Sequence, residues 1–175
     1  MPITINGSGT VTGISATGIS AQPVFPGNIL QVVQVSYSTQ TLIASTSFTD
    51  TGLSASITPT SSSNKILILI NQNYWVMQDA ASVLQGHKIT ILRGATTLMS
   101  TAGLSAGGIA ATWNSSVARG LIAGYCSLSY LDSPGSTSSL TYKTRGAAYT
   151  TSSSGQVYYQ DNNNPSYITL LEVAA

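Results

Sequence analysis

The stretch Leu53-Ser54-Ala55-Ser56-Ile57-Thr58 alternates one apolar side chain with one hydroxyl-bearing side chain. Residues 140–145 repeat this alternation, with Leu140 and Tyr142 at apolar positions. Successive side chains of a β-strand point to opposite faces, so a period of two is typical of strands with one buried and one hydroxyl-rich face. No stretch has a convincing period of 3.6. The sequence therefore predicts an all-β domain.

Turn-forming residues divide the chain into short segments. We expect strands near residues 28–36, 41–50, 53–58, 65–77, 87–93, 119–131, 138–149, 155–160 and 166–173. The clusters Asp50-Thr51-Gly52 and Asp132-Ser133-Pro134-Gly135 are expected as turns between them. Helix is expected at most as a single turn within 78–86 or 101–111. This spacing predicts an antiparallel β-sandwich of the jelly-roll type over residues 28–175.

Residues 1–27 have a different composition, in which small residues alternate with single aliphatic ones. Such a segment can lie extended but cannot bury a core of its own. We predict an extended N-terminal arm that a neighbouring molecule orders, with Ile3, Ile5, Val11 and Ile14 as its attachment residues.

The run from Ile66 to Ile70 is aliphatic at every position, so both faces of that strand need cover. The outer face of a strand in a two-layer sandwich is normally in contact with water. We therefore expect a homo-oligomer and assign Ile66, Ile68 and Ile70 to the subunit interface.

Charged residues are scarce: the 175 residues include 6 Lys and Arg and 5 Asp and Glu, or 6%, against about 25% in an average domain. By contrast, 27 serines and 22 threonines are present. Because the apolar fraction is 42% and the net charge is only +1, disorder is not expected. The few basic residues are scattered, so we expect no nucleic acid as a partner.

The chain offers little for catalysis or metal binding. Asp50 and Asp132 are interpreted as turn caps, and Glu172 as the partner of a nearby Arg or Lys. The single histidine, His87, and the single cysteine, Cys126, leave no basis for a zinc site, and Cys126 is interpreted as a buried thiol. The segment 161–164 is expected as a turn, with a Ca²⁺ site left open. We expect no catalytic residue, metal or cofactor.

Aromatic residues beside Asn and Gln are the candidates for glycan binding: Tyr74, Trp75, Trp113, Tyr158 and Tyr159. Tyr74 and Trp75 are adjacent, as are Tyr158 and Tyr159, so one member of each pair must face outward. The alternative is that these rings are half-buried at sheet edges or between subunits, and we favour it.

No targeting signal is expected, because the first residues lack a basic segment followed by an apolar one. The longest aliphatic run is too short to span a bilayer. We therefore expect synthesis in a cytoplasm without membrane insertion.

Several stretches carry a resemblance to a known family. The opening Ile3-Thr4-Ile5-Asn6-Gly7-Ser8-Gly9-Thr10 resembles the N-terminus of many virion proteins of tailed phages, especially cyanophages and other aquatic phages. Further similar stretches are residues 29–33, 47–59 running into 65–68, 130–134 and 168–174. The resemblance covers both ends and most of the middle, and residues 71–118 are the divergent part.

The resemblance implies a homotrimeric β-sandwich that serves as a tail or head fibre or as a capsid decoration protein. It also implies virion localisation and attachment through the arm to another virion protein of the capsid, neck or tail. The matching stretches are strand and turn signatures without catalytic residues, so the expected function is structural and not enzymatic. The alternative is a carbohydrate-binding module that recognises a host-surface glycan, and a polysaccharide depolymerase or esterase ranks below both.

Overall fold

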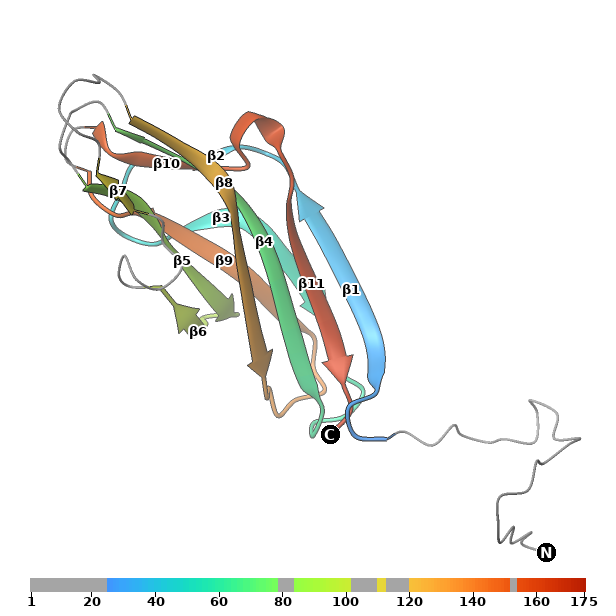
Figure 1. Ribbon diagram of the computed structural model, residues 1–175. Coiled ribbons are helices and arrows are strands. Elements are labelled where there is room, and N and C mark those ends of the chain that lie inside the picture. The colour runs from blue at the N-terminus through green and yellow to red at the C-terminus, as the bar shows by residue number, and fades with distance from the viewer. Residues whose placement is uncertain (1–24, 79–83, 102–109, 113–119, 152–153) are drawn as a thin grey trace, which may run out of the picture.

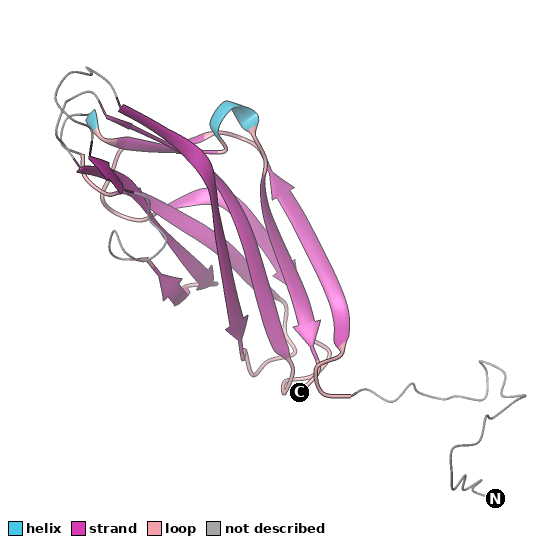
Figure 2. Cartoon of the chain, in the orientation of Figure 1, coloured by secondary structure: helices cyan, strands magenta, loops and turns pink. Residues whose placement is uncertain are grey.

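The computed structural model describes residues 25–78, 84–101, 110–112, 120–151 and 154–175. Within these residues the chain forms two antiparallel sheets that lie face to face (Figure 1). In this described part of the chain strands dominate, and helix occurs only as short turns such as η3 (Asp161–Asn163) (Figure 2). The predicted all-β antiparallel sandwich is therefore confirmed.

One sheet has six strands, with β4 (Lys65–Gln78) at its centre. One edge of β4 pairs along its whole length with β8 (Gly120–Asp132). The other edge pairs first with β11 (Ser166–Val173) and then with β10 (Gln156–Tyr159). The strands β1 (Ile29–Tyr37) and β2 (Thr41–Ile43) lie beside β11 and β10, respectively.

The second sheet has five strands in the described residues. Its main order is β3 (Thr49–Ile57), β9 (Leu140–Ala148), β5 (Leu84–Arg93) and β6 (Thr96–Ser100). The short strand β7 (Ala110–Thr112) pairs with the beginning of β5.

The connectivity is that of a jelly roll. If β2, β7 and β10 are set aside, eight strands remain, and their sheet orders are β1-β11-β4-β8 and β3-β9-β5-β6. In chain order these are strands 1-8-3-6 and 2-7-4-5, the arrangement of two sheets wound together from two Greek keys. The short strands β2 and β10 extend the first sheet beyond this core.

The strand expected over 41–50 is interrupted. The chain leaves the sheet after Ile43 and returns at Thr49, and β3 then runs without a break through the expected Asp50-Thr51-Gly52 turn. Gly52 has a φ of +88°, and the β3–β9 register shifts between Asp50 and Ser54. The glycine thus forms a bulge within one strand. A side chain at Gly52 would also collide with the ring of Tyr37.

Two strands were not expected from the sequence. Strand β6 follows a turn at Gly94, and its residues pair with β5 without a clear alternation of buried and exposed positions. Strand β7 lies partly within 101–111, where at most a helical turn was expected. Both strands pair with β5 in the five-stranded sheet.

The interior contains two apolar clusters separated by polar residues. The larger cluster includes Leu53, Ile66, Ile68, Ile91, Tyr142, Ile168 and Leu170, and the smaller includes Ile43, Tyr74, Val76, Ile89, Val157 and Tyr159. Between them the hydroxyl groups of Thr51 and Thr144 lie 2.5 Å apart, and Thr144 donates a 2.9 Å hydrogen bond to Gln72 Oε1. Gln72 Nε2 in turn donates to Ser166 Oγ at 2.8 Å. These buried groups satisfy one another, as burial requires.

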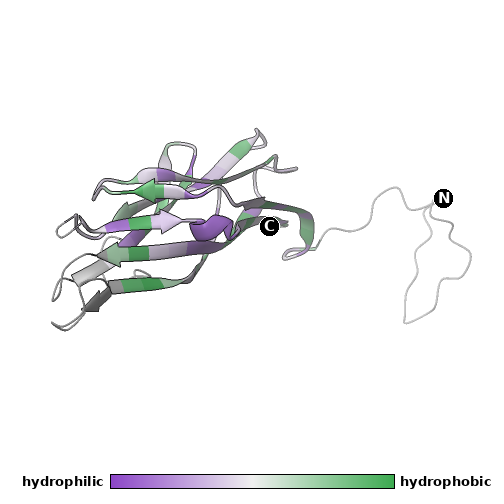
Figure 3. Cartoon of the chain, turned by 90° about the horizontal axis from the view of Figure 1, so that it is seen from above, coloured by the Kyte–Doolittle hydropathy of each residue, from purple (hydrophilic) through white to green (hydrophobic). Residues whose placement is uncertain are grey.

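The two ends of the described chain meet at one end of the sandwich. The Gly27 amide donates to the Ala174 carbonyl at 2.8 Å, and the Ala174 amide donates to the Asn28 carbonyl at 2.9 Å. The apolar beginning of β1 therefore lies beside the C-terminus, as the hydropathy colouring shows from above (Figure 3).

Candidate binding surface on the six-stranded sheet

A row of apolar side chains crosses four strands on the outer face of the six-stranded sheet. Val32 on β1 pairs with Leu171 on β11, Leu171 pairs with Leu67 on β4, and Leu67 pairs with Leu131 on β8. The neighbouring residue Ile66 points into the core, so the alternation places Leu67 outside. Val32 and Leu131 are 58% and 50% exposed. We call these four residues the apolar row.

The residues assigned from the sequence to the subunit interface lie elsewhere. Ile66, Ile68 and Ile70 are fully or almost fully buried in the larger apolar cluster of their own chain. They have no free surface for a second subunit, because they pack in one cluster with Leu53, Ile91 and Tyr142 of the opposite sheet. The open face of this strand carries Leu67 and Leu69 instead, which corrects the assignment.

The sequence contained part of the signal for the apolar row. Leu67 and Leu69 belong to the aliphatic run from Ile66 to Ile70. The sequence did not show which face of this strand points away from the core. Val32, Leu131 and Leu171 lie far apart along the chain, and only the strand register brings them beside Leu67.

Two of the candidate glycan-facing rings are in the core. Tyr74 and Tyr159 are buried, and both contact His87. The Tyr74 and His87 rings are stacked with their centroids 4.2 Å apart, and the Tyr159 hydroxyl lies 3.2 Å from His87 Nδ1. Glycan binding by Tyr74 and Tyr159 is excluded by this burial.

Their neighbours in sequence point outward. The Trp75 and Tyr158 rings lie on the outer face with their centroids 4.8 Å apart, at an angle of 51°. Leu42, 52% exposed, pairs with Tyr158 across β2 and β10. One member of each adjacent pair is thus outward, as the alternation predicted. Trp113 lies outside the described residues.

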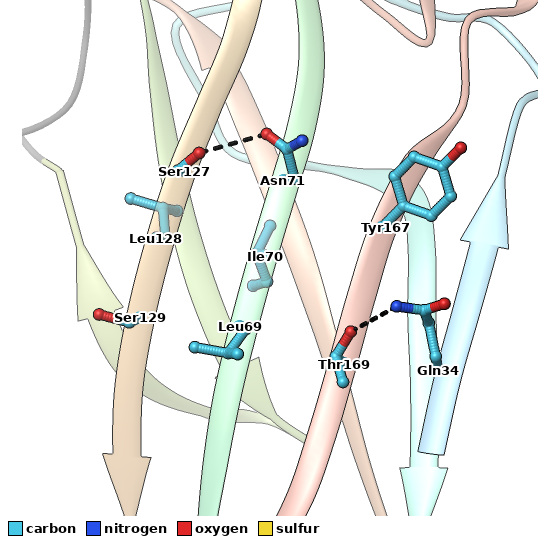
Figure 4. A pocket seen from close by; sticks show the side chains of 9 residues that line it. All are labelled: Gln34, Leu69, Ile70, Asn71, Ser127, Leu128, Ser129, Tyr167 and Thr169. Carbon is cyan, nitrogen blue, oxygen red and sulfur yellow. Dashed lines mark hydrogen bonds between the residues drawn. The ribbon is translucent and has the colours of Figure 1, made fainter. Parts of the chain in front are cut away.

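The outer face has a hollow between the apolar row and the Trp75–Tyr158 pair. Its volume is about 520 Å³, and it is lined by Gln34, Leu69, Ile70, Asn71, Ser127, Leu128, Ser129, Tyr167 and Thr169 (Figure 4). Ser127 Oγ donates a 3.2 Å hydrogen bond to Asn71 Oδ1, and Gln34 Nε2 donates a 3.0 Å hydrogen bond to Thr169 Oγ1. None of the lining side chains is charged. This site could not be predicted from the sequence, because four strands contribute residues to it.

The buried acid Asp132 links the two sheets. Its Oδ2 accepts hydrogen bonds from Arg93 Nη1 at 2.6 Å and from the Tyr142 hydroxyl at 2.7 Å. Burial and the bond to Asp132 raise the pKa of Tyr142 well above its ordinary value. Asp132 is therefore a partner in a buried ion pair, whereas the sequence suggested a turn cap.

Glu172 is buried, and none of the described Lys and Arg residues forms a salt bridge with it. Its Oε1 accepts hydrogen bonds from the Thr60 amide, the Thr60 hydroxyl and Asn64 Nδ2, at 2.6 to 2.7 Å. Burial alone would raise the pKa of Glu172, but the hydrogen bonds from Asn64 and Thr60 lower it below the ordinary value. Glu172 thus holds the 59–64 turn against β11, and its expected pairing with Arg or Lys is wrong.

The two remaining acids in the described residues also have structural partners. Asp50 forms exposed ion pairs with Lys143 at 2.8 Å and with Arg145 at 3.1 Å. Asp161 accepts hydrogen bonds from Gln40 Nε2 at 2.9 Å and from Asn162 Nδ2 at 2.8 Å. Asp161 therefore uses both carboxylate oxygens to stabilise the turn.

Cys126 belongs to the smaller apolar cluster, and His87 packs against the rings of Tyr74 and Tyr159 in that cluster. Burial lowers the pKa of His87 to about 4, so the ring is neutral near pH 7. Its Nε2 has no hydrogen-bond partner among the described residues. Burial raises the pKa of the Cys126 thiol. The thiolate is the reactive form of cysteine, so this environment disfavours reactivity.

The stretch Gly103-Leu104-Ser105-Ala106-Gly107 has the Gly-x-Ser-x-Gly spacing of a hydrolase nucleophile elbow. It lies outside the described residues. The elbow requires a strand-to-helix turn in an α/β sheet, and the two antiparallel sheets described here supply no such context.

Across the described ranges, no group of three or more His, Cys, Asp or Glu side chains is placed to hold a metal ion. The same ranges contain no helix long and apolar enough to cross a membrane. Ile3, Ile5, Val11 and Ile14 of the expected arm lie outside the described residues.

The fold is thus a jelly-roll β-sandwich with a candidate binding face that carries both apolar and polar residues. No family model and no curated protein matches the sequence. Similar solved structures include the infectious bursal disease virus T13 particle, at 14% identity and a TM-score of 0.35, and the VP2 subviral particle of the same virus, at 11% and 0.34. Another is dimeric latent PorU from Porphyromonas gingivalis, at 11% identity and a TM-score of 0.35.

The matches cover most of this chain but only part of each similar one. They span 94% of this chain and 40% and 43% of the two viral chains, and 90% of this chain and 14% of PorU. TM-scores this far below 0.5 carry no inference about function.

Proposed function

We propose that this protein is a structural, non-enzymatic component of a tailed-phage virion, a trimeric knob displayed on the particle surface and anchored by residues 1–27. The observation that carries the proposal is the apolar row, which one chain leaves open to water although it crosses four adjacent strands. Contiguous exposed apolar surface is typical of interaction sites.

The stretches that resemble phage virion proteins support this proposal through their positions. Residues 47–59 contain β3, and 65–68, 130–134 and 168–174 belong to the paired strands β4, β8 and β11 or to their ends. They include Asp132 and Glu172, whose hydrogen bonds hold this end of the sandwich together. If this chain and the phage virion proteins share one fold, residues that hold paired strands together are those expected to be similar.

Self-association through the apolar row is consistent with the charge distribution. Leu67 and Leu171 have only partial cover, and the row contains no charged side chain. Burial of such surface stabilises an interface by about 25 cal/mol per Å². A second copy of the chain presents the same apolar surface, and three copies give the trimer that the resemblance implies.

The position of the first described residues favours anchoring from the same end. Because Gly27 is hydrogen-bonded to Ala174, it lies beside the C-terminus, at the end of the sandwich that carries the apolar row. An extended segment with isolated aliphatic residues can add to a neighbouring sheet or groove. Ile3, Ile5, Val11 and Ile14 are the residues proposed to make these contacts.

The proposal is tested by locating the protein after infection. Density-gradient fractions of a phage lysate are analysed by mass spectrometry, and the particles are labelled with gold-coupled antibodies. We expect the chain to band with the particles and the label to lie on their surface. Recovery of the chain only from the soluble fraction would overturn the proposal.

A truncated form tests the anchoring separately. The chain without residues 1–27 should keep its sandwich fold by circular dichroism but fail to join particles. Loss of the fold would mean that the arm is an integral part of the sandwich, and undiminished incorporation would mean that the arm is not the anchor.

A further inference from the structure

The hollow on the outer face has the dimensions of a small-molecule site. Its volume of about 520 Å³ lies within the range of about 300–1,000 Å³ that is usual for ligand pockets. Strands β1, β11, β4 and β8 all contribute side chains to it (Figure 4). A site carried by four paired strands is more rigid than one built from loops.

The chemistry of the hollow selects a neutral ligand with many hydroxyl groups. Its polar lining consists of two amides, on Gln34 and Asn71, and the hydroxyls of Ser127, Ser129 and Thr169. None of the described residues that line it is a cation that could attract phosphate or carboxylate, and none is an anion that could attract a basic peptide. Hydrogen-bonding capacity without charge matches the hydroxyl groups of a sugar.

Each of the two side-chain amides is held by one hydrogen bond, and each keeps one polar atom that can bind a ligand. Asn71 Oδ1 accepts from Ser127, which leaves the Nδ2 group of Asn71 as a donor. Gln34 Nε2 donates to Thr169, which leaves Gln34 Oε1 as an acceptor. The hollow therefore offers one oriented donor and one oriented acceptor, and fixing these side chains in advance reduces the entropy cost of binding.

An apolar surface accompanies these polar groups. Tyr167 is 37% exposed and Leu69 is 41% exposed, and both line the hollow. The face of an aromatic ring is electron-rich, so it attracts the C–H groups of one side of a pyranose ring. An exposed tyrosine beside two amides thus matches the apolar and polar sides of a sugar.

We propose that this hollow binds a neutral saccharide unit, with its apolar face on Tyr167 and its hydroxyl groups on Asn71 Nδ2 and Gln34 Oε1. The inference deepens the proposed function, since a sugar site on a displayed knob would contact a host-surface glycan. Binding itself does not depend on incorporation into a particle. The purified chain therefore tests the sugar site, and its failure is distinguishable from failure of the virion proposal.

The test uses saturation-transfer NMR on the purified full chain. The probes are the methyl glycosides of glucose, galactose, mannose and N-acetylglucosamine, with glucuronic acid and N-acetylneuraminic acid as charged comparisons. We expect saturation transfer to at least one neutral glycoside and weaker transfer to the acids. Transfer to none of the neutral glycosides, or to the acids alone, would overturn the proposal.

Substitutions in and outside the hollow test whether the sugar binds there. Tyr167→Ala and Asn71→Ala should weaken binding by about tenfold or more, the effect of losing one good contact. Tyr167→Phe keeps the ring and should retain binding, which separates loss of the platform from loss of the fold. Tyr125→Ala removes a tyrosine that is 46% exposed on the same sheet outside the hollow, and it should bind as the unaltered chain does.

Two results with these variants contradict the proposal. If Tyr125→Ala weakens binding as much as Tyr167→Ala, the sugar does not bind in the hollow. If Tyr167→Ala leaves sugar binding intact and lowers the oligomer mass, the hollow belongs to a contact between copies of the chain.

Discussion

Asp132 on β8 and Tyr142 on β9 are joined by a 2.7 Å hydrogen bond that links the two sheets. The same carboxylate oxygen accepts from Arg93 on β5, at 2.6 Å. Asp132 is almost completely buried, and a buried carboxylate needs partners. Arg93 supplies the opposite charge, and the Tyr142 hydroxyl supplies a second hydrogen bond from the opposite sheet. The contact stabilises the end of the sandwich that also carries the apolar row.

Removal of the Tyr142 hydroxyl should destabilise the protein. A hydrogen bond to a charged group contributes about 1.5–3 kcal/mol, and Tyr142→Phe should lower the free energy of unfolding by that amount. Urea denaturation measures the change. Asp50→Asn removes a carboxylate that is 55% exposed and should cost about 0–1 kcal/mol. Equal losses in the two variants would contradict the buried role of Asp132.

The single histidine should make stability depend on pH. Burial lowers the pKa of His87 to about 4 from an ordinary value of 6.5, so the unfolded chain takes up a proton at a higher pH than the folded one. The contribution of His87 to the free energy of unfolding is therefore constant above pH 6.5. It falls by about 3 kcal/mol in total as the pH drops from 6.5 to about 4.

NMR measures this pKa directly, because the chain has only one imidazole ring. We expect its resonances to stay unchanged from pH 7 to pH 5. The pH dependence of unfolding should also be smaller in His87→Gln than in the unaltered chain. An imidazole that titrates near pH 6.5 in the folded protein would refute the neutral, buried state of His87.

Assembly should resist salt. The apolar row contains no charged residue, and the described ion pairs of Asp50 and Asp132 lie within one chain. Raising NaCl from about 0.05 to 1 M shortens the Debye length to about 3 Å, which screens exposed ion pairs but not apolar burial. Sedimentation of the oligomer at both concentrations measures the effect. Dissociation at high salt would instead implicate the charges of Lys65, Lys143 or Arg145.

The sequence predicted the strands where alternation was regular. Leu53, Ala55 and Ile57 face the core as expected, and β4 and β11 begin at the residues expected. Prediction failed at Asp50-Thr51-Gly52, where local turn chemistry was outweighed by pairing between β3 and β9. A glycine permits either a turn or a bulge, and only the partner strand decides between them.

The binding face was less predictable than the fold, because it depends on register. Alternation showed that Tyr74 and Trp75 must face opposite ways, but not which one faces the opposite sheet. The hollow needs Asn71 and Tyr167 to be paired across β4 and β11, although they are far apart in the sequence. Such pairings follow from how whole strands align and not from any local pattern.

The proposal that the apolar row joins copies of the chain is tested most directly by light scattering with two matched leucine variants. Leu131 and Leu121 are 50% and 45% exposed on the same face of β8, but only Leu131 belongs to the apolar row. At micromolar concentration we expect a mass of three 18.1 kDa chains for the unaltered protein and for Leu121→Asp, and of one chain for Leu131→Asp. A monomeric unaltered protein, or a trimer that Leu131→Asp leaves intact, would contradict it.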